Sequence, residues 1–114
     1  MLENPFTLKT RNSILEVTLC KGKANVVSAR DSRELNVMWE KFRDNPDQRF
    51  AIITGKGEKF FSAGWDLKNV AETEESSDSD YGSGGFGGLN YPRNLNKPVI
   101  CAVNGIACGG GFEI

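Results

Sequence analysis

The sequence has no histidine and only three cysteines, and these absences limit its chemistry. Without an imidazole, the chain cannot form a Ser-His-Asp or Cys-His catalytic group or a histidine metal site. The cysteines are odd in number and lack a C-x-x-C pair, so neither disulfides nor zinc is indicated, and we expect three small core residues: Cys20, Cys101 and Cys108. Any acid–base chemistry must therefore fall to carboxylates.

Long apolar runs and an excess of one charge are also missing. No stretch approaches the roughly 20 apolar residues that a membrane span needs, and residues 1–6 lack a signal-peptide pattern. The net charge of −1 gives no basic field for nucleic acid or anionic membranes. The 114 residues, 39% hydrophobic and 25% charged, fit one small globular domain. We expect a cytoplasmic protein with no nucleic-acid or membrane partner.

The hydrophobic pattern predicts an α/β order in the first half. Residues 6–9 and 13–19 read as a strand hairpin, the second strand alternating polar and apolar positions. A helix should begin between residues 28 and 32, where Asp31 and Glu34 have the spacing of an N-terminal cap and its reciprocal acid. Its apolar stripe favours a helix packed on a sheet over a cofactor-binding face: Leu35, Met38, Trp39 and Phe42.

Two later apolar runs, residues 50–54 and 99–103, have the length and β-branched content of buried strands, the first covered on both faces. Between them, residues 55–61 read as a loop and Gly64 permits an unusual backbone angle before Asp66 starts a short helix. Five of the nine residues 72–80 are acidic, and a glycine-rich stretch follows. This composition predicts a mobile loop at about residues 73–89, or a lid anchored by Tyr81, Phe86 and Leu89.

The last seventeen residues read K-P-V-I-C-A-V-N-G-I-A-C-G-G-G-F-E before the final isoleucine. Glycines 109–111 follow the strand and would stand where a helix begins, with backbone N–H groups that no Cβ covers. Glu113 follows within one helical turn, so a carboxyl would lie beside donors able to hold a developing negative charge. Close strand–helix packing and a helix-start acid are the structural alternative, and the residues alone do not decide between them.

Residues 60–68 and 102–113 together resemble the paired signatures of the crotonase (enoyl-CoA hydratase/isomerase) superfamily, in the same order and separated by a variable loop. The likeness extends to residues 23–25 and 52–55, and the S-A-G-W-D-L and G-G-G-F-E stretches most resemble a dehydratase subgroup. The resemblance implies an α/β fold: the N-terminal portion of a spiral of repeated strand-strand-helix units. Residues 1–114 would then form the N-terminal part of one crotonase-like domain.

The resemblance also implies roles for individual residues. The backbone N–H groups of Trp65 and Gly110 would hold a thioester oxygen, and Glu113 matches the first catalytic glutamate. Positions that border CoA in the family fall on Lys23, Ala24, Val26, Ala63, Asp66 and Leu67. CoA would be part of the acyl-CoA substrate, so no separate cofactor and no metal is expected.

In the family, a second glutamate and the helices of a homotrimer or dimer of trimers lie further along the chain, so residues 1–114 alone should be inactive. Two alternatives remain open. The protein could be another enzyme of the superfamily, such as an enoyl-CoA hydratase or isomerase, because these share the oxyanion segments. It could also be a non-catalytic interaction module that binds a partner through its acidic loop and an exposed sheet edge.

Overall fold

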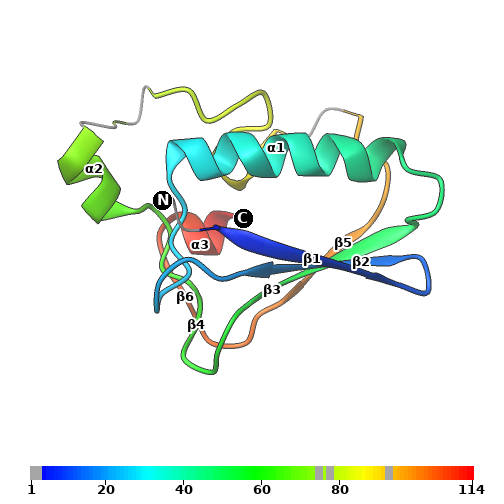
Figure 1. Ribbon diagram of the computed structural model, residues 1–114, viewed down its shortest axis with the longest axis horizontal. Coiled ribbons are helices and arrows are strands. Elements are labelled where there is room, and N and C mark those ends of the chain that lie inside the picture. Colours follow the sequence, from blue (N-terminus) through cyan, green and yellow to red (C-terminus); the bar gives the residue numbers. More distant parts are fainter. Residues whose placement is uncertain (1–3, 74–75, 77–78, 92–93) are drawn as a thin grey trace.

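The structure is a computed structural model that describes residues 4–73, 76, 79–91 and 94–114. Its strands are β1 (Phe6–Arg11), β2 (Ile14–Leu19), β3 (Phe50–Gly55), β4 (Phe60–Ser62), β5 (Val99–Ala102) and β6 (Ile106–Ala107). Its helices are α1 (Ala29–Asp44), α2 (Leu67–Thr73) and α3 (Gly110–Glu113), and η1 (Phe86–Gly88) is a 3₁₀ turn. The α/β class is therefore confirmed, and so is the predicted hairpin (Figure 1).

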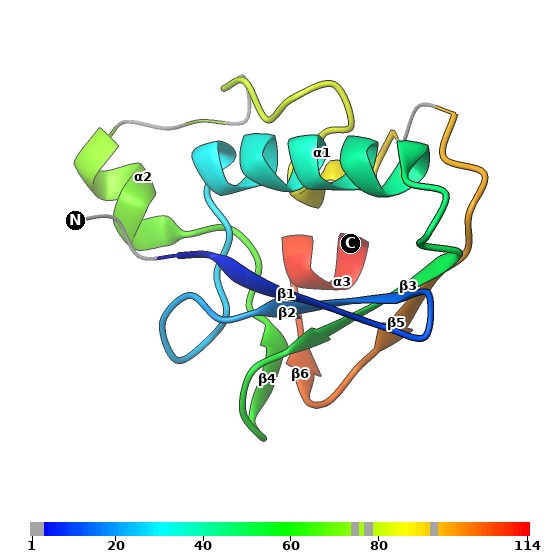
Figure 2. The ribbon, with the colours of Figure 1, turned by 45° about the vertical axis from the view of Figure 1, so that its right-hand side comes forward.

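One sheet has the strand order β1-β2-β3-β5, and β4 and β6 form a second, two-stranded sheet. β1 and β2 pair antiparallel around Asn12 and Ser13, which both have positive φ. β3 lies parallel to β2 and to β5. Parallel neighbours need a crossover, and α1 supplies it between β2 and β3. Figures 1 and 2 show α1 lying along one face of the larger sheet.

The core lies between α1 and that face of the sheet. The predicted stripe of α1 is buried, and it contacts the inward-facing residues of β2 and β3: Leu15, Val17, Leu19, Ala51 and Ile53. Each large apolar side chain buried in this way typically contributes about 1.5–3 kcal/mol. The expected helix on a sheet is therefore confirmed.

The N-terminus of α1 corrects the predicted cap. Ser28, not Asp31, is the capping residue: its side-chain oxygen accepts from the Asp31 N–H at 3.1 Å, and the Asp31 carboxylate accepts from the Ser28 N–H at 2.9 Å. Glu34 lies one turn further along the helix, exposed to solvent. Ser28 and Asp31 have the same three-residue spacing as Asp31 and Glu34, and the helix begins at the earlier of these two pairs.

Burial is lower than the apolar runs predicted. In β3, Ala51 and Ile53 are buried whereas Ile52 on the opposite face is only partly covered. β5 is largely exposed, with Ile100 at 51%. Two of the supposed core cysteines, Cys101 and Cys108, are exposed and the third is partly covered. Ile52 and Ile100 lie on the sheet face opposite α1, against which no described element packs. Cys101 pairs with Ile53 on the face toward α1, but it lies on the edge strand β5.

The segment between β3 and β5 also differs from expectation. The strand β4 comprises Phe60–Ser62, although residues 55–61 were predicted to form a loop. A strand of three residues is too short to show a period in the sequence. Of the predicted mobile loop, residues 74, 75, 77 and 78 lie outside the described residues, and the mobility of residues 73–89 stays a prediction. None of the helices in the described chain is long and apolar enough to cross a membrane.

Candidate active site

Two loops leave the small sheet side by side. β4 and β6 pair in parallel, with Phe60 opposite Ile106 and Ser62 opposite Ala107. Because the carboxyl ends of parallel strands meet at one edge, the residues that follow them emerge together. The Cys108 N–H donates to the Ser62 carbonyl at 3.2 Å and ties the two loops at their start. Figure 2 shows both strands rising toward α3.

Gly64 is the point where these loops touch. Its φ is +91°, and a Cβ there would lie 2.7 Å from the Gly110 nitrogen and 3.0 Å from the Gly111 nitrogen. The Gly64 N–H donates to the Ser62 hydroxyl at 3.1 Å, which fixes its orientation. Since the Trp65 nitrogen is bonded to the Gly64 carbonyl carbon, standard bond lengths place it within roughly 6 Å of the Gly110 nitrogen. At that separation one oxygen could lie within hydrogen-bond distance of both nitrogens.

The second loop turns into α3 at its glycines. Gly109 caps the helix with φ +54°, and its carbonyl accepts from the N–H groups of Phe112 and Glu113 at 3.1 and 3.3 Å. Within the described part of the chain, no acceptor bonds the Gly110 N–H. The first N–H groups of a helix have no partner inside it, so this one is open to a ligand oxygen.

Glu113 lies in the same short helix, and its side chain is exposed. Its backbone carbonyl accepts a hydrogen bond from the Asn90 side chain at 3.3 Å. The structure thus places the three residues predicted to be catalytic in two adjacent segments: Trp65 in the loop after β4, and Gly110 and Glu113 in α3. Their roles remain predictions.

The residues predicted to border CoA lie on two backbone segments that run beside each other. The Ala63 N–H donates to the Ala24 carbonyl at 2.9 Å, the Val27 N–H to Gly64 at 2.8 Å, and the Asp66 N–H back to Val27 at 3.0 Å. Around this ladder, Lys23 and Leu67 are exposed, whereas Ala24, Val26 and Ala63 are partly covered. The fold therefore brings the whole predicted set together.

Asp66 differs from that set because its side chain is buried in an ion-paired cluster. The Lys21 ammonium lies 2.8 Å from its carboxylate and 2.7 Å from the carboxylate of Asp31. Burial would raise the pKa of Asp66, but hydrogen bonds from Lys21 and from the Asn69 N–H outweigh burial and lower that pKa. Burial would likewise lower the pKa of Lys21, but the hydrogen bonds that its ammonium donates to both carboxylates outweigh burial and raise that pKa.

Sequence reasoning missed Lys21. It lies in a K-G-K turn, where a lysine is normally solvated, and its two partners follow 10 and 45 positions later. No local spacing relates these three residues, so only the folded chain reveals the cluster.

The glycine-rich loop reaches the site through Phe86. A Cβ on Gly110 would lie 2.5 Å from the Phe86 ring, so ring and glycine are in contact. The ring centroid of Tyr81 lies 6.0 Å from that of Phe86. The aromatic side chain therefore stands beside one of the predicted oxyanion donors.

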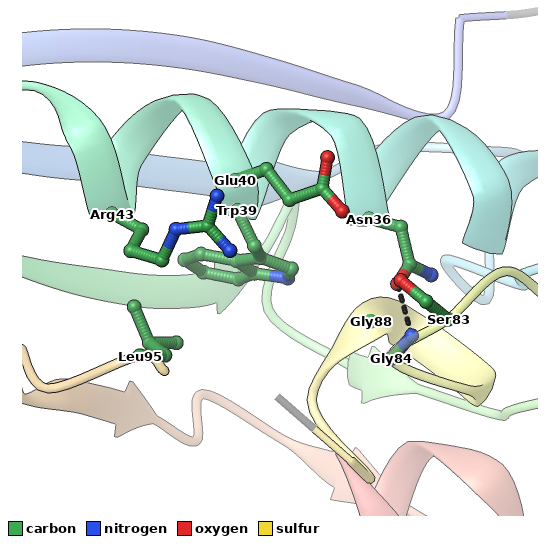
Figure 3. Close-up of a pocket in the computed structure, with 8 residues that line it drawn as sticks. All are labelled: Asn36, Trp39, Glu40, Arg43, Ser83, Gly84, Gly88 and Leu95. Carbon is green, nitrogen blue, oxygen red and sulfur yellow. Dashed lines mark hydrogen bonds between the residues drawn. The ribbon is translucent and has the colours of Figure 1, made fainter. Parts of the chain in front are cut away.

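α1 holds this loop in place. The Asn36 side chain accepts from the Gly84 N–H (Figure 3), and the Trp39 indole N–H donates to the Gly87 carbonyl at 2.9 Å. The Ser32 hydroxyl accepts from the Gly87 N–H at 3.0 Å. The cavity between helix and loop is only about 20 Å³, room for a single water molecule. No cluster of three or more potential metal ligands occurs among the described residues.

Comparisons with known proteins point to one family. Residues 9–114 match the family described as enoyl-CoA hydratase/isomerase. A curated carnitinyl-CoA dehydratase from Escherichia coli (strain K12) is 60% identical over 106 residues, which cover 92% of this chain and 40% of that protein. A carnitinyl-CoA dehydratase from Proteus mirabilis (strain HI4320) is 55% identical over 107 residues, 94% of this chain and 41% of that protein. The chain thus spans about 40% of the length of these relatives.

Solved structures agree with this match. A carnitinyl-CoA hydratase from Mycobacterium avium superimposes with a TM-score of 0.83 at 30% identity, over 98% of this chain and 43% of the other. An enoyl-CoA hydratase from Bacillus anthracis gives a TM-score of 0.80 at 31% identity, over 96% and 43%. The predicted fold is therefore confirmed.

Proposed function

The chain belongs to the enoyl-CoA hydratase/isomerase (crotonase) family, and from that premise we propose that its protein interconverts carnitinyl-CoA and crotonobetainyl-CoA by removing or adding water. The curated relatives at 55–60% identity carry the name carnitinyl-CoA dehydratase, which favours this reaction over other chemistry of the family. Because the chain spans about 40% of their length, the activity is proposed for the whole protein that contains it.

The proposed reaction passes through an enolate. Dehydration removes a proton from the carbon next to the thioester carbonyl, and the neighbouring carbon loses hydroxide, which leaves as water once protonated. Negative charge develops on the thioester oxygen, where the N–H groups of Trp65 and Gly110 would donate. A donor placed in this way is typically worth about 3 kcal/mol in the transition state. The Glu113 carboxyl is the group that would move a proton. The contact between Gly64 and the Gly110 nitrogen carries this proposal.

In this proposal CoA enters as part of the substrate, and neither a separate cofactor nor a metal ion takes part. It would lie along the ladder between residues 23–26 and 63–67, where exposed side chains such as Lys23 can meet its phosphates. The Asp66 carboxylate is held by Lys21, so Asp66 would contribute its backbone. Phe86 would border the acyl group beside Gly110.

Glu113→Gln in the full-length protein tests the proposal. Hydration of crotonobetainyl-CoA should fall about 10²–10⁴-fold, because the amide cannot transfer a proton. Glu58→Gln is the matched control, since Glu58 is an exposed acid outside the proposed site. If Glu113→Gln retained the activity of Glu58→Gln, the assignment of Glu113 would be wrong. Faster turnover of crotonyl-CoA than of crotonobetainyl-CoA would instead favour an enoyl-CoA hydratase.

Residues 1–114 alone should show no enzymatic turnover, because only one of their carboxylates, Glu113, matches a catalytic position. Substantial turnover by residues 1–114, lost in Glu113→Gln, would contradict this expectation.

We expect the full-length protein to be a homotrimer or a dimer of trimers, and light scattering should give three or six subunit masses. A monomer mass would contradict this expectation.

One observation favours a non-catalytic interaction module. Large apolar side chains are exposed around β5, β6 and α3: Ile100, Val103, Ile106 and Phe112. A protein partner could cover them. This alternative predicts that the full-length protein hydrates none of the acyl-CoA thioesters named above.

A further inference from the structure

We propose that Lys21 is a positioning residue, whose ammonium joins Asp31 and Asp66 and thereby fixes the loop that presents the Trp65 N–H to the thioester oxygen. Its catalytic consequence rests on the proposed function, whereas its effect on the loop does not. Lys21 lies outside the residues predicted to touch substrate, so it would act through Asp66 and the backbone.

The cluster is compact and mostly shielded from water. One nitrogen, Lys21 Nζ, lies 2.7 Å from Asp31 Oδ2 and 2.8 Å from Asp66 Oδ2. The exposed fractions of the side chains are 17% for Lys21, 6% for Asp31 and 11% for Asp66. Ion pairs on a surface contribute little, but breaking a shielded pair leaves an uncompensated charge and costs much more.

The three residues come from three separate parts of the fold. Asp31 belongs to the capping box of α1, so it is fixed to the most regular element of the chain. Asp66 directly follows Trp65 and accepts from the Asn69 N–H at 3.1 Å. Lys21 also accepts a backbone hydrogen bond from the Val26 N–H at 3.2 Å. Its side chain therefore connects the α1 cap to the Trp65 loop.

The Trp65 peptide lies between two hydrogen bonds that this connection supports. Before it, the Gly64 carbonyl accepts from the Val27 N–H at 2.8 Å, and after it the Asp66 N–H donates to the Val27 carbonyl at 3.0 Å. If the Asp66 side chain turned out to solvent, its backbone would lose an anchor. A donor displaced by about 1 Å can cost on the order of a hundredfold in rate.

A direct role in binding CoA phosphates is less consistent with these contacts. The Lys21 ammonium has two carboxylates within 2.8 Å, whereas Lys23 is exposed two residues away. A phosphate would have to compete with both carboxylates for Lys21. The two roles differ in kinetics, because loss of a phosphate contact raises KM whereas loss of positioning lowers kcat.

The test uses Lys21→Met, Lys21→Arg and Asp66→Asn in the full-length protein. Methionine keeps the unbranched stem without the charge, arginine keeps the charge, and asparagine removes the acceptor charge at nearly constant size. Arg30→Met is the matched control, since it breaks a solvent-exposed ion pair with Glu34 in α1, the helix that also contains Asp31. Two quantities are measured: amide exchange at Asp66, and kcat and KM for crotonobetainyl-CoA.

We expect Asp66 exchange to rise at least about tenfold in Lys21→Met and Asp66→Asn, and kcat to fall about 10- to 100-fold in Lys21→Met with KM within about twofold. Lys21→Arg should retain most of both properties, and Arg30→Met should match the parent protein. Unchanged exchange in Lys21→Met, or in Asp66→Asn should the first variant not fold, would overturn the proposal. So would a rise in KM at constant kcat. If the parent protein hydrated no acyl-CoA, the proposed function would fail while the exchange result still decided the role of Lys21.

Discussion

Gly64 and Gly57 have nearly the same φ angle but different neighbours. Their φ angles are +91° and +92°, yet a Cβ on Gly57 would meet no atom within 4 Å whereas one on Gly64 would press on the Gly110 nitrogen. A substitution at Gly57 therefore measures the energetic cost of a positive φ alone. The same substitution at Gly64 adds the cost of pushing the two loops apart.

We predict that alanine is far more damaging at Gly64 than at Gly57. Gly57→Ala should lower the free energy of unfolding by about 1–2 kcal/mol, the usual cost of such a backbone angle for an L-residue. Gly64→Ala should cost more and also reduce kcat, because it separates Trp65 from Gly110. Urea unfolding and steady-state kinetics of the full-length protein check this. Equal effects of both substitutions would mean that the contact at Gly64 does not matter.

The Lys21 cluster should make stability depend on pH in two windows. The pKa of Asp66 is lowered in the folded state, so its contribution is present above its unfolded pKa, about 3.9, and is lost as pH falls through the folded value. The pKa of Lys21 is raised, so its contribution is present below about 10.4 and is lost as pH rises through the folded value.

The stability difference between the parent protein and Lys21→Met should therefore be constant from about pH 5 to 10 and shrink outside that range. Denaturant unfolding at a series of pH values measures it. A difference that shrank between pH 5 and 8 would require another titrating group.

Individual residues could be predicted where their signal is local. The unusual backbone angle at Gly64 and the helix start at glycines 109–111, with Glu113 in its first turn, were predicted because glycines and a nearby acid are visible in the sequence. Lys21 was not, since its partners are distant. Cys101 and Cys108 were predicted to be buried from their apolar or glycine-rich neighbours in the sequence, and both are exposed, because such neighbours do not by themselves place a side chain in the core.

At the scale of elements, the glycine-rich loop depends on α1. The Asn36 side chain accepts from Gly84 and donates to the carbonyls of Tyr81 and Gly85 at 2.9 and 3.3 Å. One buried amide thus satisfies three backbone groups of the loop. This anchoring predicts that the backbone amides of residues 84–88 are protected from exchange with solvent.

Asn36→Ala should therefore raise amide exchange at residues 84–88 at least about tenfold, because the buried backbone groups lose a partner worth roughly 1–3 kcal/mol. Glu40→Ala, an exposed position one turn along the same helix, is the control and should leave exchange unchanged. Exchange at residues 84–88 that is already fast in the parent protein would show that the loop is mobile throughout.

Elements of five or more residues were predicted well, because their periods are visible in a sequence window. The hairpin, α1 and β3 fall where the pattern put them. β4 and β6 were missed because they have three and two residues, and their paired residues lie 45 and 46 positions apart in the chain. That pairing, not the local sequence, joins the two predicted oxyanion loops.

The arrangement of the whole molecule was accessible from sequence only through the paired motifs, which indicated the family and hence the fold. Composition alone gave one small globular domain. A hydrophobic pattern does not say whether another element covers an apolar residue. Around β5 and α3, Ile100 and Phe112 are 51% and 78% exposed because no described element lies over them.

The central claim is that the backbone N–H groups of Trp65 and Gly110 hold the same thioester oxygen. A crystal structure of the full-length protein with an unreactive acyl-CoA analogue tests it most directly. We expect a thioester oxygen within about 3 Å of both nitrogens, with the Glu113 carboxylate facing the carbons next to the thioester. A thioester oxygen bound elsewhere, or held by only one of the two N–H groups, would contradict it.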